Sequence, residues 1–224
     1  MNAIELFREA SKQHIFKNLS FKKAWEVWLP QIKNILGNNY NADDLIKLGN
    51  HLRDIFLSTS DESRDQSQIS IGGNSWESFV CWYLNLCMIG SKSVVIKPLK
   101  KFTPNAIKEA MSVNYGNYSS NSESDLIAIT FPSFLSIEDK SEIFKKIFME
   151  CEQKISELEV VTIQCKTNWN DNAQIPMLWD MIYKSTKFKD INLSIGKNSR
   201  HISHFKSFKY SFVTVPTQKN LSKF

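Results

Sequence analysis

EVVTIQCK, residues 159–166, is an apolar run of strand length that ends in two polar side chains. Its many β-branched residues favour a buried β-strand. Because successive side chains of a strand point to opposite faces, Gln164 and Lys166 lie on the same face. An amide oxygen and an ammonium group then meet solvent together at the end of a buried strand, where α/β proteins commonly place chemistry. The purely structural alternative is a polar strand end with a snorkelling lysine.

Acidic residues precede two further apolar segments upstream. Asp125 leads directly into an apolar strand predicted at residues 126–131. Glu77 follows the Gly-Gly-Asn-Ser sequence at residues 72–75 and lies at the start of a segment that is apolar nearly all round, which predicts a buried helix. The chain order is therefore an acid on a helix, an acid before a strand, and an amide and a lysine at the end of another strand.

With these residues the chain resembles the PD-(D/E)XK nuclease superfamily, and within it the type II restriction endonucleases, over roughly residues 72–184. The resemblance implies an α/β fold with a central mixed β-sheet flanked by helices, restriction-endonuclease-like. It assigns Asp125 as the first acid and Lys166 as the lysine of the motif. Gln164 stands where most members carry the second acid, a variant that some members share. Glu77 matches the auxiliary helical glutamate of some members.

The site implied by this resemblance is a Mg²⁺ site, because Mg²⁺ prefers hard oxygen ligands. The candidate ligands are Asp125, Gln164, the backbone carbonyl of Cys165, and Glu77. Lys166 would orient the attacking water and stabilise developing negative charge. Replacing a carboxylate by Gln164 removes a full charge, which predicts weak metal affinity without DNA. Glu77 could restore that charge, although an acid in the first turn of a helix is also what the helix dipole favours.

DNA contacts are expected from the loop after the 159–166 strand and from residues 197–209. Asn pairs naturally with adenine, and Arg and Lys with guanine. The candidates are Asn168, Asn170, Asn172, Lys197, Arg200, His201, Lys206 and Lys209. His201 and His204 could instead touch metal or phosphate, or be ordinary surface residues.

The charge distribution agrees with a polyanion partner. The chain has a net charge of +5, and the segment from Met181 to Phe224 holds nine Lys or Arg residues and one acid, Asp190. The residues before it are therefore net negative. A basic C-terminal segment fits phosphate contacts, and a solvated basic surface is the alternative.

Composition limits the other function classes. A chain of 224 residues with 42% hydrophobic content predicts one globular domain, or one with a small appendage. No apolar run reaches membrane-spanning length, and the N-terminus carries charges unlike those of a signal peptide, so a cytoplasmic protein is expected. The four cysteines form no Cys-x-x-Cys pair and are expected to be reduced, buried thiols. Cys165 should face away from Gln164, so it is not expected to be a nucleophile.

The sequence divides into three parts. Residues 1–57 predict a helical subdomain with a break at Gly37 and an N-cap at Asn41, residues 58–75 a linker ending in a turn, and residues 76–224 the nuclease core with its basic segment. Further elements are expected as a strand at 93–97, a helix at 103–111 capped by Thr103, a loop at 114–124, a helix at 174–183, and strands at 190–195 and 210–215.

A helix of about 20 residues is expected after Ser136, between the two motif strands. A strand–helix–strand unit is normally parallel. The resemblance, in contrast, implies that the two motif strands are antiparallel neighbours.

The expected function is that of a Mg²⁺-dependent endonuclease acting on double-stranded DNA, most simply a sequence-specific type II restriction enzyme. A homodimer and a cognate methyltransferase are implied by the resemblance alone. One alternative is a repair or recombination nuclease that recognises structure and not sequence. Another is a catalytically inactive DNA-binding module, in which residues 1–57 form an oligomerisation face.

Overall fold

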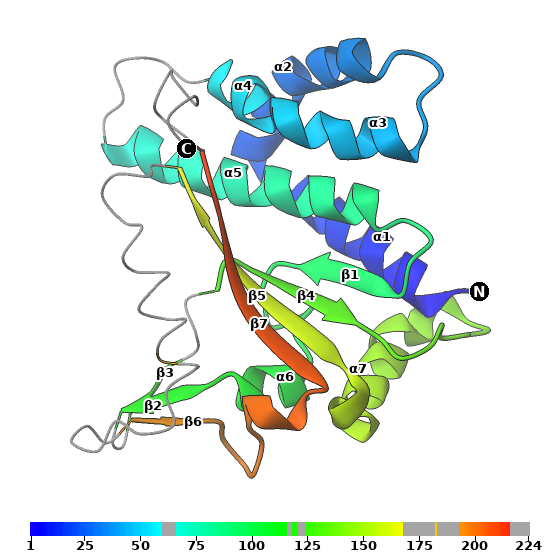
Figure 1. The fold of residues 1–224 in the computed structure, drawn as a ribbon, viewed down its shortest axis with the longest axis vertical. Helices are drawn as coiled ribbons and strands as arrows, with labels where there is room; N and C mark the ends of the chain where they lie inside the picture. The colour runs from blue at the N-terminus through cyan, green and yellow to red at the C-terminus, as the bar shows by residue number, and fades with distance from the viewer. Residues whose placement is uncertain (60–65, 116–117, 121–123, 168–181, 183–192, 216–224) are drawn as a thin grey trace.

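The computed structural model describes residues 1–59, 66–115, 118–120, 124–167, 182 and 193–215. A four-stranded mixed β-sheet flanked by helices forms its centre (Figure 1), so the expectation of an α/β fold with a mixed sheet is confirmed. The strands lie in the order β1 (Ser93–Ile96), β4 (Leu126–Thr130), β5 (Glu159–Lys166) and β7 (Ser207–Thr214).

The two motif strands, β4 and β5, are antiparallel neighbours, and β5 pairs in parallel with β7. The parallel arrangement that the intervening helix predicted is therefore wrong. After β4 the chain first runs along the N-terminus, where the Ala3 N–H donates to the Leu135 carbonyl. It enters α7 (Ile143–Gln153) only later, and it returns so that Glu159 lies opposite Thr130. The connection thus closes a wide hairpin and does not cross over the sheet.

Helices cover both faces of the sheet (Figure 1). On one face α1 (Ala3–Ile15), α6 (Asn105–Ala110) and α7 pack on alternate strand residues such as Ile127. On the other face α5 (Gln66–Cys87) packs on the intervening residues such as Leu126 and Ile163. Alternation of side chains along each strand divides the core in this way.

The N-terminal region folds as the helical pattern predicts. It contains α1, α2 (Leu19–Leu36), α3 (Ala42–Lys47), the 3₁₀ turn η1 (Leu48–His51) and α4 (Leu52–Leu57). Gly37 ends α2 with a positive φ of 67°, and Asn41 forms a capping box with Asp44, as expected. The helices α2 and α4 pack on α5 through Trp28 and Phe56, whereas α1 contributes to the sheet core directly.

The helix α5 begins earlier than expected. It starts at Gln66, so the turn and N-cap predicted at residues 72–75 are wrong. A glycine inside a helix costs about 1 kcal/mol relative to alanine, and here burial of Trp76 and Phe79 further along the helix offsets that cost. As a consequence Glu77 lies in the middle of α5, where the helix dipole does not explain an acid.

Two other helices differ from expectation in length or capping. The helix expected to extend for about 20 residues is the shorter α7, 11 residues long, preceded by η2 (Lys140–Glu142) and followed by η3 (Ile155–Glu157). The Thr103 hydroxyl does not cap α6 but donates to the Leu99 carbonyl at 3.0 Å. A local bond to the preceding turn has replaced the cap.

Part of the expected loop at 114–124 is strand. A second, three-stranded antiparallel sheet has the order β3 (Tyr118–Ser120), β2 (Val113–Tyr115), β6 (Leu193–Ile195). The Asn114 side chain supports it by donating to the Gly196 carbonyl at 2.7 Å. The 3₁₀ turn η4 (Ile202–His204) then leads into β7. The helix expected at 174–183 lies outside the described residues except for Ile182.

No helix among the described residues is long and apolar enough to cross a membrane. All four cysteines are free thiols. Cys81, Cys151 and Cys165 are buried as expected, but Cys87 is exposed, because it lies at the last position of α5, where the helix leaves the core.

Candidate functional site at the end of the sheet

Three strands place polar side chains at one end of the four-stranded sheet. Antiparallel pairing puts the end of β1 and the end of β5 beside the start of β4. Leu126 lies opposite Ile163, so the next residue pair in register is Asp125 and Gln164. We call this region the polar end; it consists of Glu77, Lys97, Asp125, Gln164 and Lys166. Strand pairing thus brings together residues that are far apart in the sequence.

The Asp125 carboxylate lies against the backbone of β5. Its Oδ2 accepts a hydrogen bond from the Cys165 N–H at 2.6 Å. Burial raises the pKa of Asp125 to about 6, and the negative charge of Glu77 adds to that rise. The Cys165 hydrogen bond and the positive charges of Lys166 and Lys97 lower this pKa but do not cancel the rise. Perturbation of this kind is common at functional sites.

Gln164 is held by a contact that the sequence did not predict. Its side chain is 1% exposed, and its Oε1 accepts a hydrogen bond from the Tyr210 hydroxyl at 2.5 Å. Tyr210 lies on β7, which runs parallel to β5. A carbonyl oxygen has two lone pairs, so this bond leaves one position for a second donor or a cation. The amide oxygen is therefore oriented, but it is buried and does not meet solvent, contrary to the expectation from the sequence.

Glu77 and Lys97 form an ion pair at this end of the sheet. Their Oε2 and Nζ atoms are 2.9 Å apart, and each side chain is about one-fifth exposed. Lys97 was not predicted from the sequence as a site residue. A signal was present, because Lys97 ends an apolar strand in the same way as Lys166 ends its own. Its partner, however, comes from α5 and could not be identified from local sequence.

Lys166 and Cys165 behave as strand alternation predicts. Lys166 is half-buried, lies opposite Thr214 in the ladder, and makes no ion pair with any described residue. The Cys165 side chain packs in the cluster under α5, whereas Gln164 bonds to Tyr210, which packs on the opposite face of the sheet. Burial, with Asp125 nearby, raises the pKa of the Cys165 thiol well above its usual value, which argues against a nucleophile.

The oxygen donors at the polar end match the preferences of a hard cation in part. Asp125 and Glu77 are carboxylates, and their mutual repulsion is the kind that a divalent ion relieves. Lys97 now performs that neutralisation for Glu77. Within the described ranges, no group of three or more His, Cys, Asp or Glu side chains is placed to hold a metal. A metal at this end would therefore need Gln164 or a backbone carbonyl to complete its ligands.

The residues expected to contact DNA fall into four groups, of which His201 is the last. Asn168, Asn170 and Asn172 lie outside the described residues. Lys197 and Lys209 are exposed, and no ion pair joins either to a described residue.

The third group has partners within the protein. Arg200 pairs with Glu109 at 3.0 Å and also with Glu152, so its guanidinium joins α6 to α7. Lys206 pairs with Glu159 at 2.6 Å.

The two histidines of this region lie at the η4 turn. The His201 ring caps that turn by accepting from the Ser203 N–H at 3.0 Å. Burial, with a contribution from the charge of His204, lowers the pKa of His201.

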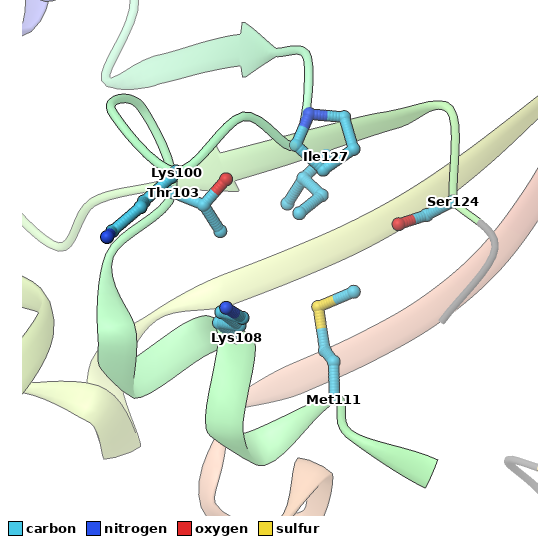
Figure 2. A pocket seen from close by; sticks show the side chains of 7 residues that line it. Lys100, Thr103, Lys108, Met111, Ser124 and Ile127 are labelled. Carbon is cyan, nitrogen blue, oxygen red and sulfur yellow. The ribbon is translucent and has the colours of Figure 1, made fainter. Parts of the chain in front are cut away.

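A cavity of about 300 Å³ is lined in part by Ser124, the residue before Asp125 in the chain (Figure 2). Residues of the β1–α6 connection, α6 and β4 surround it: Pro98, Lys100, Thr103, Lys108, Met111, Ser124 and Ile127. A second cleft of similar volume lies beside Lys97 and includes His14, Lys17 and Ser78. Basic side chains therefore line two hollows that flank the end of β1.

A scan against models of known protein families finds no match for this chain, and no curated protein matches it either.

Proposed function

We propose that the chain is a Mg²⁺-dependent endonuclease that hydrolyses phosphodiester bonds of double-stranded DNA. The observation that carries the proposal is the position of Asp125 beside the Gln164–Lys166 end of β5, on a neighbouring antiparallel strand, with its carboxylate 2.6 Å from the Cys165 nitrogen. This is the strand relation that the PD-(D/E)XK resemblance implies, and the raised pKa of Asp125 adds electrostatic support. A restriction-endonuclease-like core is part of the same proposal.

In this proposal Asp125, Glu77, the Gln164 amide oxygen and the Cys165 carbonyl would hold the cation. Mg²⁺, when bound, supplies a more acidic water and neutralises charge on the leaving oxygen. Lys166 makes no ion pair with the described residues, so its ammonium is available to orient a water and to stabilise the negative charge that develops on the phosphate. The Tyr210 hydroxyl positions Gln164.

The ion pair between Lys97 and Glu77 opposes metal binding at Glu77. While Lys97 pairs with it, the Glu77 carboxylate is neutralised and offers less to a cation. Binding of Mg²⁺ at Glu77 requires this ion pair to loosen, and Gln164 brings no charge of its own. Both features favour weak metal affinity in the absence of DNA, whose phosphate would supply a further oxygen ligand.

Sequence-specific cleavage, with a homodimer on a symmetric site and a cognate methyltransferase, is the most specific form of the proposal. It rests on the resemblance, and the exposed Lys197 and Lys209 support it only as phosphate or base contacts. Arg200 and Lys206 are better explained as structural residues than as DNA contacts, because Glu109 and Glu152 engage Arg200 and Glu159 engages Lys206.

The experiment is Mg²⁺-dependent cleavage of unmethylated phage DNA by the purified protein and by Lys166→Ala. Discrete fragments that disappear in the variant support the proposal, with an expected loss of about 10²–10³-fold in rate. Lys206→Ala is the matched control, since that lysine lies at the other end of the sheet in a surface pair. Fragments without fixed ends would indicate a nuclease that recognises structure. Equal cleavage by Lys166→Ala would overturn the assigned role.

One observation favours a second candidate, a DNA-binding module without catalysis. Both auxiliary oxygen donors are already engaged, Glu77 by Lys97 and Gln164 by Tyr210. Salt-dependent DNA binding without cleavage in Mg²⁺ would favour this candidate over the nuclease.

A further inference from the structure

The cavity beside Asp125 has two kinds of wall (Figure 2). Met111 and Ile127 form a buried apolar side, and two exposed lysines, Lys100 and Lys108, belong to the rest of the lining. The Thr103 hydroxyl donates to Leu99, and its oxygen can still accept a hydrogen bond. A ligand that fits these walls combines negative charge with an apolar part.

The positive charge at this cavity is uncompensated by its neighbours. No ion pair reaches the ammonium group of Lys100 or of Lys108 from any described residue. Glu109, the acid nearest in sequence to Lys108, is already engaged by Arg200 at 3.0 Å and by Asn198 at 2.9 Å. The acid is thus turned toward the 198–200 turn, and the two lysines remain available to an external anion.

The cavity adjoins the proposed catalytic carboxylate. Ser124 immediately precedes Asp125, and Ile127 follows it by two residues on β4. Asp125 lies in the chain between these two lining residues, at the bend that leads into β4. A strand of nucleic acid that presents one phosphate to Asp125 therefore has a neighbouring unit within reach of the cavity.

We propose that this cavity is a subsite for a backbone phosphate of the DNA strand, adjacent to the phosphate that is cut. The inference rests on the proposed nuclease function and adds a binding role for Lys100 and Lys108. The ammonium groups contact the phosphate, and the deoxyribose packs on Met111 and Ile127. Lysines are point charges and not planar forks, so the subsite positions the strand without reading its bases.

The test is DNA binding by the full chain and by the double variant Lys100→Gln/Lys108→Gln. A labelled duplex is titrated in EDTA, so that cleavage does not interfere, at several salt concentrations. Each neutralised phosphate contributes about 0.9 to the slope of log affinity against log salt, so loss of the contact with this one phosphate should reduce the slope by about 0.9. Both side chains are exposed, and the variant should therefore fold normally, which a matching thermal melt checks.

The control removes the same charge elsewhere. Lys33→Gln/Lys47→Gln changes two exposed lysines in the last turns of α2 and α3, neither of which lines the cavity, and should leave the slope unchanged. A second measurement scans the duplex with single neutral methylphosphonates. One position should weaken binding to the wild type and have no effect on the double variant, as expected when both changes remove one contact.

The outcomes separate the subsite from the nuclease. A reduced slope supports the subsite whether or not the DNA is cut. A slope equal to that of the control overturns it, even if Lys166→Ala abolishes cleavage and so leaves the nuclease intact. Failure of the wild type to bind the duplex at any salt concentration overturns the subsite as well.

Discussion

The two ends of the four-stranded sheet carry similar residue types, but their charged groups are compensated to different extents. At the end opposite to Asp125, the polar side chains of Glu159, Lys206, Ser93 and Thr130 are paired with one another. Lys206 bonds to Glu159 at 2.6 Å, and this contact lowers the pKa of Glu159. The Ser93 and Thr130 hydroxyls bond to each other at 2.8 Å. We call this region the paired end, and it is an ordinary solvated sheet edge.

At the polar end, in contrast, the charge of Asp125 is not fully compensated by its neighbours. Burial outweighs every attractive contact and raises the pKa of Asp125, although two lysines are near enough to lower it. Lys166 makes no ion pair with a described residue, and Lys97 is engaged by Glu77. The number of charges does not distinguish the two ends. The polar end differs in a carboxylate that the fold keeps partly desolvated and incompletely compensated, a feature common at functional sites.

The largest effect on cleavage is expected for Asp125→Asn. If the polar end is catalytic, loss of this charge should reduce cleavage by about 10³-fold, since a metal ligand contributes several kcal/mol to charge stabilisation in the transition state. The same change should stabilise the folded protein by about 1–2 kcal/mol at pH 7, a value discounted because the group is partly exposed. The asparagine oxygen can still accept the Cys165 hydrogen bond.

The pH dependence of stability follows from the direction of the Asp125 shift. Its pKa in the folded protein, about 6, lies above the ordinary value of 3.8, so the folded chain keeps this proton to higher pH. The contribution of Asp125 to stability is therefore greatest below about pH 4 and declines as pH rises to about 6. Urea denaturation from pH 4 to 7 should show this decline in the wild type and not in Asp125→Asn. Parallel curves for the two proteins would contradict the raised pKa.

A smaller effect is expected from Tyr210→Phe. The hydroxyl bonds to a buried amide oxygen, and its removal should destabilise the protein by about 1 kcal/mol. Tyr40→Phe is the matched control, since the Tyr40 side chain is 53% exposed and should tolerate the loss. Chemical denaturation of the two variants compares them directly. Equal stabilities would mean that Gln164 is not held by Tyr210, and the orientation argued for its oxygen would fail.

The strands of the sheet were predictable because their information is local. The apolar runs at 126–131 and 159–166 carry β-branched side chains in an unbroken series, and burial on both faces needs little else. The pairing of these strands was not predictable from the intervening helix, since direction depends on where the chain travels before α7. The Ala3–Leu135 hydrogen bond that fixes this path joins residues 132 positions apart.

The residues of the candidate site were likewise predictable only where local sequence reveals their position. Asp125, Gln164 and Lys166 were found because each stands at a strand end, a position visible in sequence. Lys97 and Tyr210 were missed because their roles depend on partners that come from α5 and β5. The glycines at 72–73 gave a false signal for a turn, since tertiary burial of α5 outweighs a weak local preference.

The smallest effect is expected at the paired end. Lys206→Gln removes the contact that lowers the pKa of Glu159, so this carboxyl should titrate at higher pH in the variant, as side-chain NMR can follow. A lowered pKa stabilises the fold above the ordinary value and loses that effect as pH falls, which is opposite in sign to Asp125. Both side chains are well exposed, so solvent screening should leave stability and cleavage unchanged within error. If Lys206→Gln instead impaired cleavage as strongly as Lys166→Ala, the two ends would be equivalent, and incomplete charge compensation would no longer distinguish the catalytic end.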